Sequence, residues 1–432
     1  MTSPTDLSAA HADLWPLGRP FEGQVPRRMR AWTLRRERFG EPRQAFAEEL
    51  IDVPEPGPGE VLVAVMAAGV NYNGVWAGRG HPVDVIAARR RGGGDPEEFQ
   101  ICGTDAAGVV ARLGPGVSGL NVGDEVVLAG SQWDLDCPHV RAGGDPVCSR
   151  TFRIWGYETN WGSFAQFCKV QARQCFPKPG WLTWEEAGSY AATALAAYRM
   201  LFHWGENALR AGDVVLVWGG AGGLGSYCLQ MIKDAGGVGV AVVSSPSKVD
   251  YCLALGAAGC IDRRAYDHWG LTPGPDDEEA DKVWLRGREK DGVLGFRRAL
   301  WKAAGQRVSP RLVIEHPGAD TLPTSLFLCA PGGMVVTCGA TSGYVGQVDL
   351  RYLWMQQKRL QGSHGADDHD MAEVNRMFEE HRLRPCLART FPWHELPEAH
   401  DLMARNEHPS GCMSVLVGAE RTGLGARPER SA

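Results

Sequence analysis

The chain has 432 residues, of which 44% are hydrophobic, and it carries a formal net charge of −6. This length is more than one ordinary hydrophobic core organises, so it predicts two domains. The acidic balance excludes nucleic acid as a main partner, because such a partner needs a surface rich in Lys and Arg.

Two further features of the composition bear on where the protein works. No apolar run reaches the roughly 18 residues of a membrane span, and the polar start of the chain is unlike a signal peptide. The 12 cysteines form no CxxC pair. We therefore expect a reduced, cytoplasmic protein without a membrane partner.

The first part of the chain predicts a tail followed by a β-rich region. Residues 1–28 are polar and rich in Pro and Gly, so we expect a tail or an oligomer arm. Residues 54–60 have turn composition. The basic run Arg89-Arg90-Arg91 precedes three glycines and is expected to be a solvated loop. The runs that predict strands are residues 61–70, 109–117 and 123–128.

A helix is expected to begin beside Thr183. Thr183 and Glu186 have the spacing of a capping box, in which each side chain accepts a backbone N–H of the other residue.

The most informative segment begins with the apolar run Val214–Trp218, which ends in a glycine cluster and continues with helical spacing over residues 226–233. Such an apolar run is typical of a buried parallel strand. The glycines permit a tight turn and a close approach to a pyrophosphate at the helix N-terminus. This order predicts a dinucleotide-binding unit. The residues expected to bind the dinucleotide are Gly219, Gly220, Ala221, Gly222, Gly223, Leu224 and Gly225.

The second strand of this unit, residues 240–243, is expected to end at the adenosine ribose. An NAD site usually places an acidic residue there, whereas an NADP site needs hydroxyls and a cation. The chain has Ser244, Ser245 and Lys248 at this point. We therefore predict NADPH as the cofactor; a polar loop with a solvated lysine is the alternative.

Two later segments complete the chain. Residues 273–291 are acidic and predict a loop at the surface or at an oligomer contact. Residues 371–380 predict a helix, and the end of the chain is expected to fold back onto the first domain.

Seven blocks of sequence carry a resemblance to a known family. They are Gly69–Gly78, Arg153–Asn160, Leu182–Ala187, Ala197–Phe202, Glu315–Gly318, Arg351–Met355 and Gly362–His364. With the glycine cluster, they resemble the crotonyl-CoA carboxylase/reductases, a branch of the medium-chain dehydrogenase/reductase superfamily. The resemblance implies an α/β fold, with a GroES-like, β-rich catalytic domain and a Rossmann domain that has a doubly wound parallel sheet.

The resemblance also implies how the chain divides. The catalytic domain is expected over residues 29–190 and 350–420, and the Rossmann NADPH-binding domain over residues 191–349. Residues 1–28 and 421–432 are left as tails. The protein is expected to form a homo-oligomer, a dimer or a tetramer.

Zinc enzymes of this superfamily hold their catalytic metal partly through a Gly-His-Glu stretch. The chain has Cys102-Gly103-Thr104-Asp105 there, so the histidine is missing. The closely spaced cysteines of a structural zinc lobe are missing as well. We therefore predict no metal site.

The implied reaction is the reductive carboxylation of a 2-enoyl-CoA, crotonyl-CoA or a longer homologue, to an alkylmalonyl-CoA. Hydride addition to the β-carbon leaves an enolate, and the co-substrate CO2 then takes the place of a proton at the α-carbon. A plain NADPH-dependent enoyl-thioester or quinone reductase and a catalytically silent NADPH-binding protein are the alternatives.

The family's CO2 pocket maps onto four residues: Asn71 as an amide donor, Tyr157 by its main chain, Glu158 by positioning water, and His364 as an imidazole donor. Each side chain has a structural alternative. Asn71 would bond the turn backbone, Glu158 would pair with Arg153, and His364 would be a satisfied core histidine.

The family's CoA-binding block maps onto Arg351 and Tyr352, beside the adenosine phosphate, because a guanidinium suits a phosphate. A surface arginine at a subunit contact is the alternative.

The chain departs from the family pattern at three places. Gly365-Ala366-Asp367 stands where most members have Phe-Ala-Asn, Ala330-Pro331 replaces a basic residue, and Ala196-Ala197 replaces Thr-Ala. These changes favour a substrate other than the usual four-carbon one. By analogy, they suggest the supply of polyketide extender units.

Overall fold

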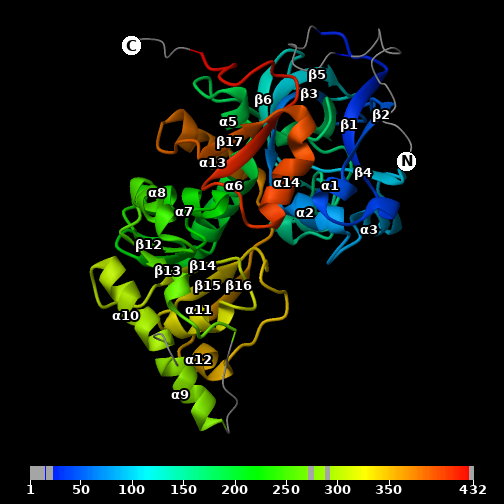
Figure 1. The fold of residues 1–432 in the computed structure, drawn as a ribbon. Helices are drawn as coiled ribbons and strands as arrows, with labels where there is room; N and C mark the ends of the chain where they lie inside the picture. Colours follow the sequence, from blue (N-terminus) through cyan, green and yellow to red (C-terminus); the bar gives the residue numbers. More distant parts are fainter. Residues whose placement is uncertain (1–14, 16–22, 271–276, 288–291, 428–432) are drawn as a thin grey trace. The chain divides into compact units, whose positions relative to one another are not determined.

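The computed structural model describes residue 15 and residues 23–270, 277–287 and 292–427. The chain divides into two compact units. Unit 1 contains residues 1–192, 367–375 and 387–432, and unit 2 contains residues 193–366 and 376–386. Figure 1 shows the elements of both, coloured along the chain.

Parts of the predicted tails lie outside the described residues, namely 1–14, 16–22 and 428–432. Of the helices that the structure describes, none combines the length and the apolarity needed to cross a lipid bilayer.

Unit 1 is built on a seven-stranded sheet around β3 (Glu60–Val70), the predicted strand at residues 61–70. Every β3 residue after Glu60 is buried, and β3 pairs antiparallel with β5 (Ala106–Leu113). β5 ends earlier than predicted, because the chain turns at Gly114. The other strands of this sheet are β6 (Glu125–Leu128), β9 (Phe167–Gln171), β10 (Cys175–Pro177), β17 (Leu387–Phe391) and β18 (Cys412–Leu416).

The end of the chain completes this sheet, as expected, because β18 pairs with β3 on one side and with β17 on the other. Two small sheets accompany it. They are β2 (Ala47–Asp52), β1 (Arg28–Arg35) and β4 (Phe99–Ile101), and the pair β7 (Ser131–Gln132) and β8 (Arg153–Ile154).

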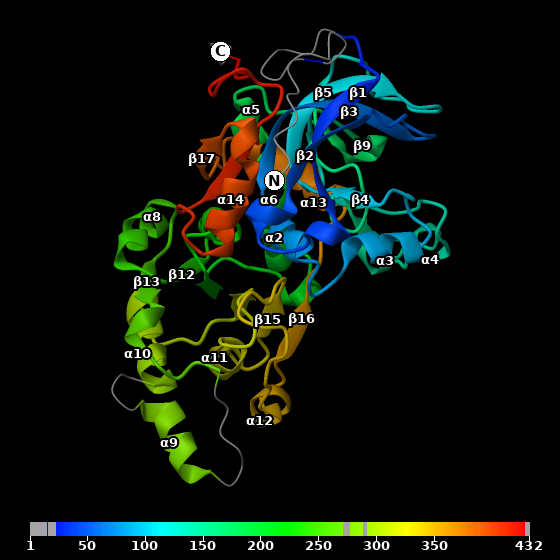
Figure 2. The same ribbon diagram turned by 45° about the vertical axis from the view of Figure 1, so that its right-hand side comes forward.

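Among the helices of unit 1, α14 (Leu396–Ala404) packs against α1 (Pro42–Ala45) and α2 (Tyr72–Arg79), as Figure 2 shows. The remaining helices that begin in this unit are α3 (Val85–Arg91), α4 (Pro138–Arg141), α5 (Trp184–Ala187), α6 (Ala191–Phe202) and α13 (Asp368–Glu379).

Two sequence predictions in unit 1 have opposite outcomes. The capping box at Thr183 is confirmed, since Thr183 and Glu186 exchange both bonds at the start of α5. The solvated loop at residues 89–91 is wrong. This segment is the end of α3, and Arg89 is buried because its guanidinium donates to the Asp95 carbonyl and to Gln100 Oε1.

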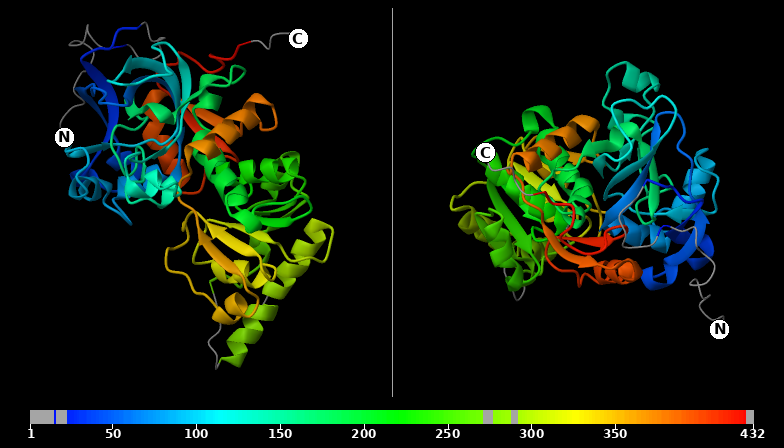
Figure 3. Two further views of the ribbon diagram at one scale, coloured as in Figure 1. Left: turned by 180° about the vertical axis from the view of Figure 1, so that it is seen from behind. Right: turned by 90° about the horizontal axis from the view of Figure 1, so that it is seen from above.

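Unit 2 contains a six-stranded parallel sheet in the order β13-β12-β11-β14-β15-β16. This is the doubly wound order, in which the chain runs outward from β11 first to one edge and then to the other. Figure 3 shows the strands from green to orange. Their bounds are β11 (Val214–Trp218), β12 (Val238–Val243), β13 (Gly259–Asp262), β14 (Leu312–Glu315), β15 (Met334–Thr337) and β16 (Arg359–Gly362).

The core of unit 2 lies against this sheet, where Leu216, Val240, Val313 and Val335 from four neighbouring strands are fully buried. The helices of unit 2 are α7 (Gly223–Asp234), α8 (Val249–Ala254), α9 (Glu278–Arg286), α10 (Val293–Ala304), α11 (Leu322–Leu328) and α12 (Leu350–Trp354).

The structure corrects two predictions in unit 2. The acidic segment at 273–291, described here over 277–287, contains the helix α9, which Asp277 caps and which buries Trp284. The predicted domain boundary at residue 350 differs from the observed one. Residues 350–366 and 376–386 belong to unit 2. The first of these segments does so because β16 hydrogen-bonds to β15 and extends the parallel sheet.

Candidate active site

The predicted dinucleotide loop follows β11 in unit 2. Gly219 has φ +58°, in the left-handed region that favours glycine. A Cβ atom added at Gly220 would lie 2.6 Å from Ala241 Cβ, and one at Gly225 would lie 2.4 Å from the Gly219 carbonyl oxygen. These positions therefore require glycine for the turn and for helix–strand packing. Gly222 brings no side chain to cap α7, so the first N–H groups of that helix suit a pyrophosphate.

A buried polar network supports the start of this loop. Trp218 Nε1 donates to Ser325 Oγ at 2.8 Å, and Ser325 Oγ donates to Glu315 Oε2 at 2.5 Å. Thr321 Oγ1 donates to the other Glu315 oxygen at 2.6 Å. Burial raises the pKa of Glu315, and these bonds oppose that rise. Sequence reasoning missed Ser325, on α11, and Thr321, directly before it, because single hydroxyls in such positions carry no signal of their own.

The predicted ribose end of the site lies where β12 ends at Val243. Lys248 Nζ donates to Ser244 Oγ at 3.3 Å, and both residues are half-buried. Ser245 Oγ accepts the N–H of Ser247 at 3.3 Å and caps a short turn. A cation and a hydroxyl therefore stand together at this position, as an adenosine 2′-phosphate requires.

Asn71 is in unit 1, at the N-cap position of α2, yet its side chain makes no capping bond. Its Nδ2 donates instead to Asp105 Oδ2 at 3.0 Å. The alternative in which Asn71 bonds the turn backbone is therefore not what the structure shows. Asp105 is fully buried and was noted in the sequence only as part of a missing zinc motif.

Tyr157 and Glu158 follow β8 in unit 1 and are half-buried. Glu158 Oε2 accepts the N–H of Ile154 at 2.8 Å. Burial, with the nearby Cys102 and Glu158, raises the pKa of Tyr157 to about 12. Arg153 donates to the carbonyls of residues 150 and 152, and no ion pair joins it to Glu158 among the described residues.

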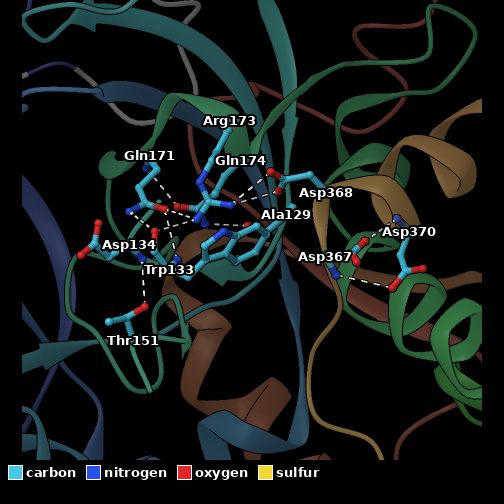
Figure 4. A network of polar contacts seen from close by, with 10 residues as sticks. All are labelled: Ala129, Trp133, Asp134, Thr151, Gln171, Arg173, Gln174, Asp367, Asp368 and Asp370. Atoms are coloured by element: carbon cyan, nitrogen blue, oxygen red, sulfur yellow. Dashed lines mark hydrogen bonds and ion pairs between the residues drawn. The ribbon is translucent and has the colours of Figure 1, made fainter. Parts of the chain in front are cut away.

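His364 is exposed and follows β16 in unit 2. The chain enters unit 1 at Asp367, and Asp368 is held there by Arg173, whose Nη1 donates to its Oδ2 at 3.1 Å. Figure 4 shows the Arg173 guanidinium over the Trp133 ring, 3.4 Å from its centroid. The segment after His364 is thereby anchored in unit 1.

The departure at Gly365-Ala366-Asp367 includes a structural role. Asp367 Oδ1 accepts the N–H of Asp370 at 2.9 Å, which caps the start of α13 (Figure 4). Gly365 has φ +70°.

The predicted CoA residues lie on α12. Arg351 is exposed and already paired with Asp349, through Nη2 to Oδ2 at 2.7 Å. Tyr352 packs edge-on against Phe327, with ring centroids 5.2 Å apart. A phosphate at Arg351 would therefore compete with the Asp349 carboxylate.

The region that matches the zinc motif is occupied by other interactions. Burial raises the pKa of Cys102 to about 12, so this thiol is neutral, and Thr104 Oγ1 accepts the Asn73 amide at 3.2 Å. Within either unit taken by itself, the described residues bring together no three Cys, His or carboxylate ligands. The absence of a metal stays a prediction.

Comparisons with known proteins agree with this architecture. Residues 57–180 match the model of the alcohol dehydrogenase GroES-like domain, and residues 223–380 match that of the zinc-binding dehydrogenases. The crotonyl-CoA carboxylase/reductase of Cereibacter sphaeroides is 46% identical over 417 residues, which cover 96% of this chain and 94% of that protein. The chain belongs to the crotonyl-CoA carboxylase/reductase family.

Solved structures of the crotonyl-CoA carboxylase/reductase family match as well. The crotonyl-CoA carboxylase/reductase AntE in complex with NADP is 51% identical, with a TM-score of 0.89 over 95% of this chain and 100% of that chain. The 2-octenoyl-CoA carboxylase reductase CinF, in complex with NADP and 2-octenoyl-CoA, is 35% identical, with a TM-score of 0.84 over 93% of this chain and 90% of that chain. The predicted family, the medium-chain superfamily and the α/β fold are confirmed.

Proposed function

We propose that the protein catalyses the NADPH-dependent reductive carboxylation of a 2-enoyl-CoA to an alkylmalonyl-CoA. Its family supports this reaction. The observation that carries the carboxylating step is the Asn71 amide, which stands at a helix N-cap and yet is held away from that helix by Asp105. The bond to Asp105 uses one of the two hydrogens of the Asn71 NH2 group, so the second would be able to donate to a ligand.

The cofactor would be held by unit 2. The glycines at 219–225 allow the pyrophosphate to approach the backbone, and Ser244 with Lys248 would bind the 2′-phosphate. When bound, NADPH supplies a hydride to the β-carbon of the substrate.

The chain's own residues would decide what happens at the α-carbon. Asn71 and His364 would donate hydrogen bonds to the oxygens of CO2, and Glu158 would fix a water beside it. The enolate α-carbon then forms a C–C bond to CO2, and the negative charge passes to the new carboxylate. The pKa of Tyr157 is raised to about 12, so its phenol is a weaker acid than a free tyrosine, which would slow proton delivery to the enolate.

The substrate is proposed as crotonyl-CoA or a longer homologue, with Arg351 and Tyr352 near its adenosine phosphate. Gly365, which replaces an aromatic residue of the family pattern, leaves more room for an acyl chain. We also propose a homo-oligomer, a dimer or a tetramer.

The test measures NADPH consumption with crotonyl-CoA, 2-octenoyl-CoA and enoyl-CoAs of intermediate length, with and without bicarbonate, and identifies the products by mass. We expect carboxylated product in the wild type. H364N and E158A should keep hydride transfer within about tenfold while the uncarboxylated acyl-CoA increases, since a barrier difference of ~1–3 kcal/mol is enough to change the preference.

The matched control is H369N, the same substitution at an exposed histidine of α13. It should keep the wild-type product ratio. A wild type that makes only uncarboxylated product at saturating bicarbonate would contradict the proposal and favour the plain reductase.

A further inference from the structure

We infer that Asp105 is a positioning residue for Asn71: its buried carboxylate sets the direction of the Asn71 amide and thereby the share of substrate that is carboxylated. This inference rests on the proposed function and names a residue that acts through Asn71.

The β3–β5 pairing brings the two residues together. Ala68 lies opposite Ala106 in the register, so Gly69 meets Asp105, and the Gly69 N–H donates to the Asp105 carbonyl at 3.3 Å. A Cβ atom at Gly69 would lie 2.7 Å from Asp105 Cβ and 2.8 Å from its Oδ2. The glycine therefore makes room for the carboxylate, which reaches Asn71 just beyond the end of the strand.

Both carboxylate oxygens of Asp105 take a donor. Oδ1 accepts the N–H of Ala192 in the first turn of α6 at 2.5 Å, and Oδ2 accepts Asn71 Nδ2 at 3.0 Å. An ionised carboxylate only accepts hydrogen bonds. Asn71 must therefore turn its NH2 group toward Asp105, and its Oδ1 lies on the other side of the amide. The carboxylate therefore decides which end of the Asn71 amide, Nδ2 or Oδ1, faces residue 105.

The charge at this position distinguishes Asp105 from an ordinary helix cap. Burial raises the pKa of its carboxyl to about 6, and the bonds from Asn71 and Ala192 hold it from rising further, so the ionised form predominates at neutral pH. A neutral Ser or Asn also caps a helix, without the free-energy cost of burying a charge.

A neighbouring amide at the start of α2 provides an internal comparison. Asn73 Nδ2 donates to Thr104 Oγ1 at 3.2 Å. A hydroxyl both donates and accepts, so it holds an amide in either direction. Of the two acceptors Thr104 and Asp105, only Asp105 fixes which way the amide bonded to it points. That amide belongs to Asn71, the residue proposed to bind CO2.

The test is D105N, which keeps the shape of the side chain. Its single carbonyl oxygen will stay with Ala192, because a backbone N–H has no alternative role, and its NH2 group will face Asn71. The Asn71 amide must then turn its Oδ1 toward residue 105. We expect NADPH oxidation with enoyl-CoA to stay within about tenfold, while the ratio of carboxylated to uncarboxylated product falls about tenfold or more.

T104V is the matched control: it removes the bond to Asn73 and should keep the wild-type ratio. D105S is a second variant, which removes the carboxylate without introducing an amide, and it should lower the ratio because the Asn71 amide becomes free to turn. Thermal unfolding and NADP binding measured by fluorescence establish that each variant is folded.

A double-mutant cycle with N71A decides whether Asp105 acts through Asn71. We expect D105N to leave the product ratio of N71A unchanged. Two outcomes overturn the inference and leave the proposed function standing. In one, D105N changes the product ratio equally in the wild type and in N71A. In the other, D105N and D105S both keep the wild-type product ratio. A wild type that makes no carboxylated product overturns the proposed function and the inference with it.

Discussion

At the scale of single residues, the burial of Asp105 makes stability depend on pH. Its pKa is raised from 3.8 to about 6. The folded state therefore binds this proton more tightly than the unfolded state, so the fold loses stability as pH rises through 6 and regains it as pH falls toward 4. A shift of this size corresponds to about 3 kcal/mol for a fully buried group. We expect D105N to exceed the wild type in stability at neutral pH and to lose that advantage in acid.

Urea unfolding of wild type and D105N from about pH 4 to pH 8 measures this difference in the free energy of unfolding, with T104V as the control that leaves the charge in place. If the free energies of unfolding of wild type and D105N differ by the same amount at every pH, the expectation is contradicted.

The sequence identified Asn71 but not the role of Asp105. Asn71 belongs to a recognisable block of sequence. The contact of Asp105 with Asn71 instead depends on the register between β3 and β5 and on the space that Gly69 leaves. Neither is visible until the two strands are paired. The one available signal was a glycine inside an apolar strand, which marks a close approach.

Lys248 supports a second prediction at this scale. Because its Nζ lies beside Ser244 at the end of β12, K248A should weaken NADPH binding about ten- to a hundredfold, ~1.5–3 kcal/mol, and leave NADH binding nearly unchanged. Fluorescence titration with both cofactors measures this, and K302A, at an exposed lysine of α10, is the control. Equal losses for the two cofactors would count against the predicted 2′-phosphate site.

At the scale of elements, α11 supports the glycine loop through one hydroxyl. S325A would leave Trp218 Nε1 without its acceptor and one oxygen of the buried Glu315 without its donor. We expect a loss of about 1–3 kcal/mol in the free energy of unfolding and weaker NADPH binding, because Trp218 leads directly into Gly219.

The residue next to Ser325 provides a matched control. Thr324 is also buried on α11, but its Oγ1 has no hydrogen-bond partner among the described residues. T324V should therefore be neutral or slightly stabilising. Thermal unfolding and NADPH titration of the two variants test the pair; equal destabilisation would show that the network has no special role.

Elements were predictable where one local rule decided them. The apolar run of β3 and the capping box at Thr183 needed no tertiary context. The helices α3 and α9 were missed for the opposite reason. Arg89 is buried only because four acceptors gather around its guanidinium, and α9 is helical although Trp284 is its only buried residue among those described.

At the scale of the whole molecule, the missing zinc motif makes a prediction about composition. Cys102 is a neutral thiol, and Thr104 replaces the histidine. Purified protein should therefore contain no stoichiometric zinc, and a chelator should leave activity unchanged. Elemental analysis that returns one zinc per chain would contradict this.

The two-domain organisation was predictable, but its boundary was not. A glycine loop after a buried strand predicts a parallel sheet, but no sequence signal identifies the strand at which that sheet ends. β16 is short and mostly exposed, with the pattern of a surface segment rather than a buried strand. Only its pairing with β15 assigns residues 350–366 to unit 2.

The place of β18 also affects how the protein folds during its synthesis. β3 is synthesised well before β18, which pairs with residues 67–70 of β3. Until β18 is made, residues 67–70 of β3 lack this partner, and an unpaired apolar strand edge is a template for aggregation. The parallel sheet of unit 2 has all its strands by residue 362 and is able to form first. Loss of β18 should therefore leave nascent chains dependent on chaperones even though unit 2 is intact.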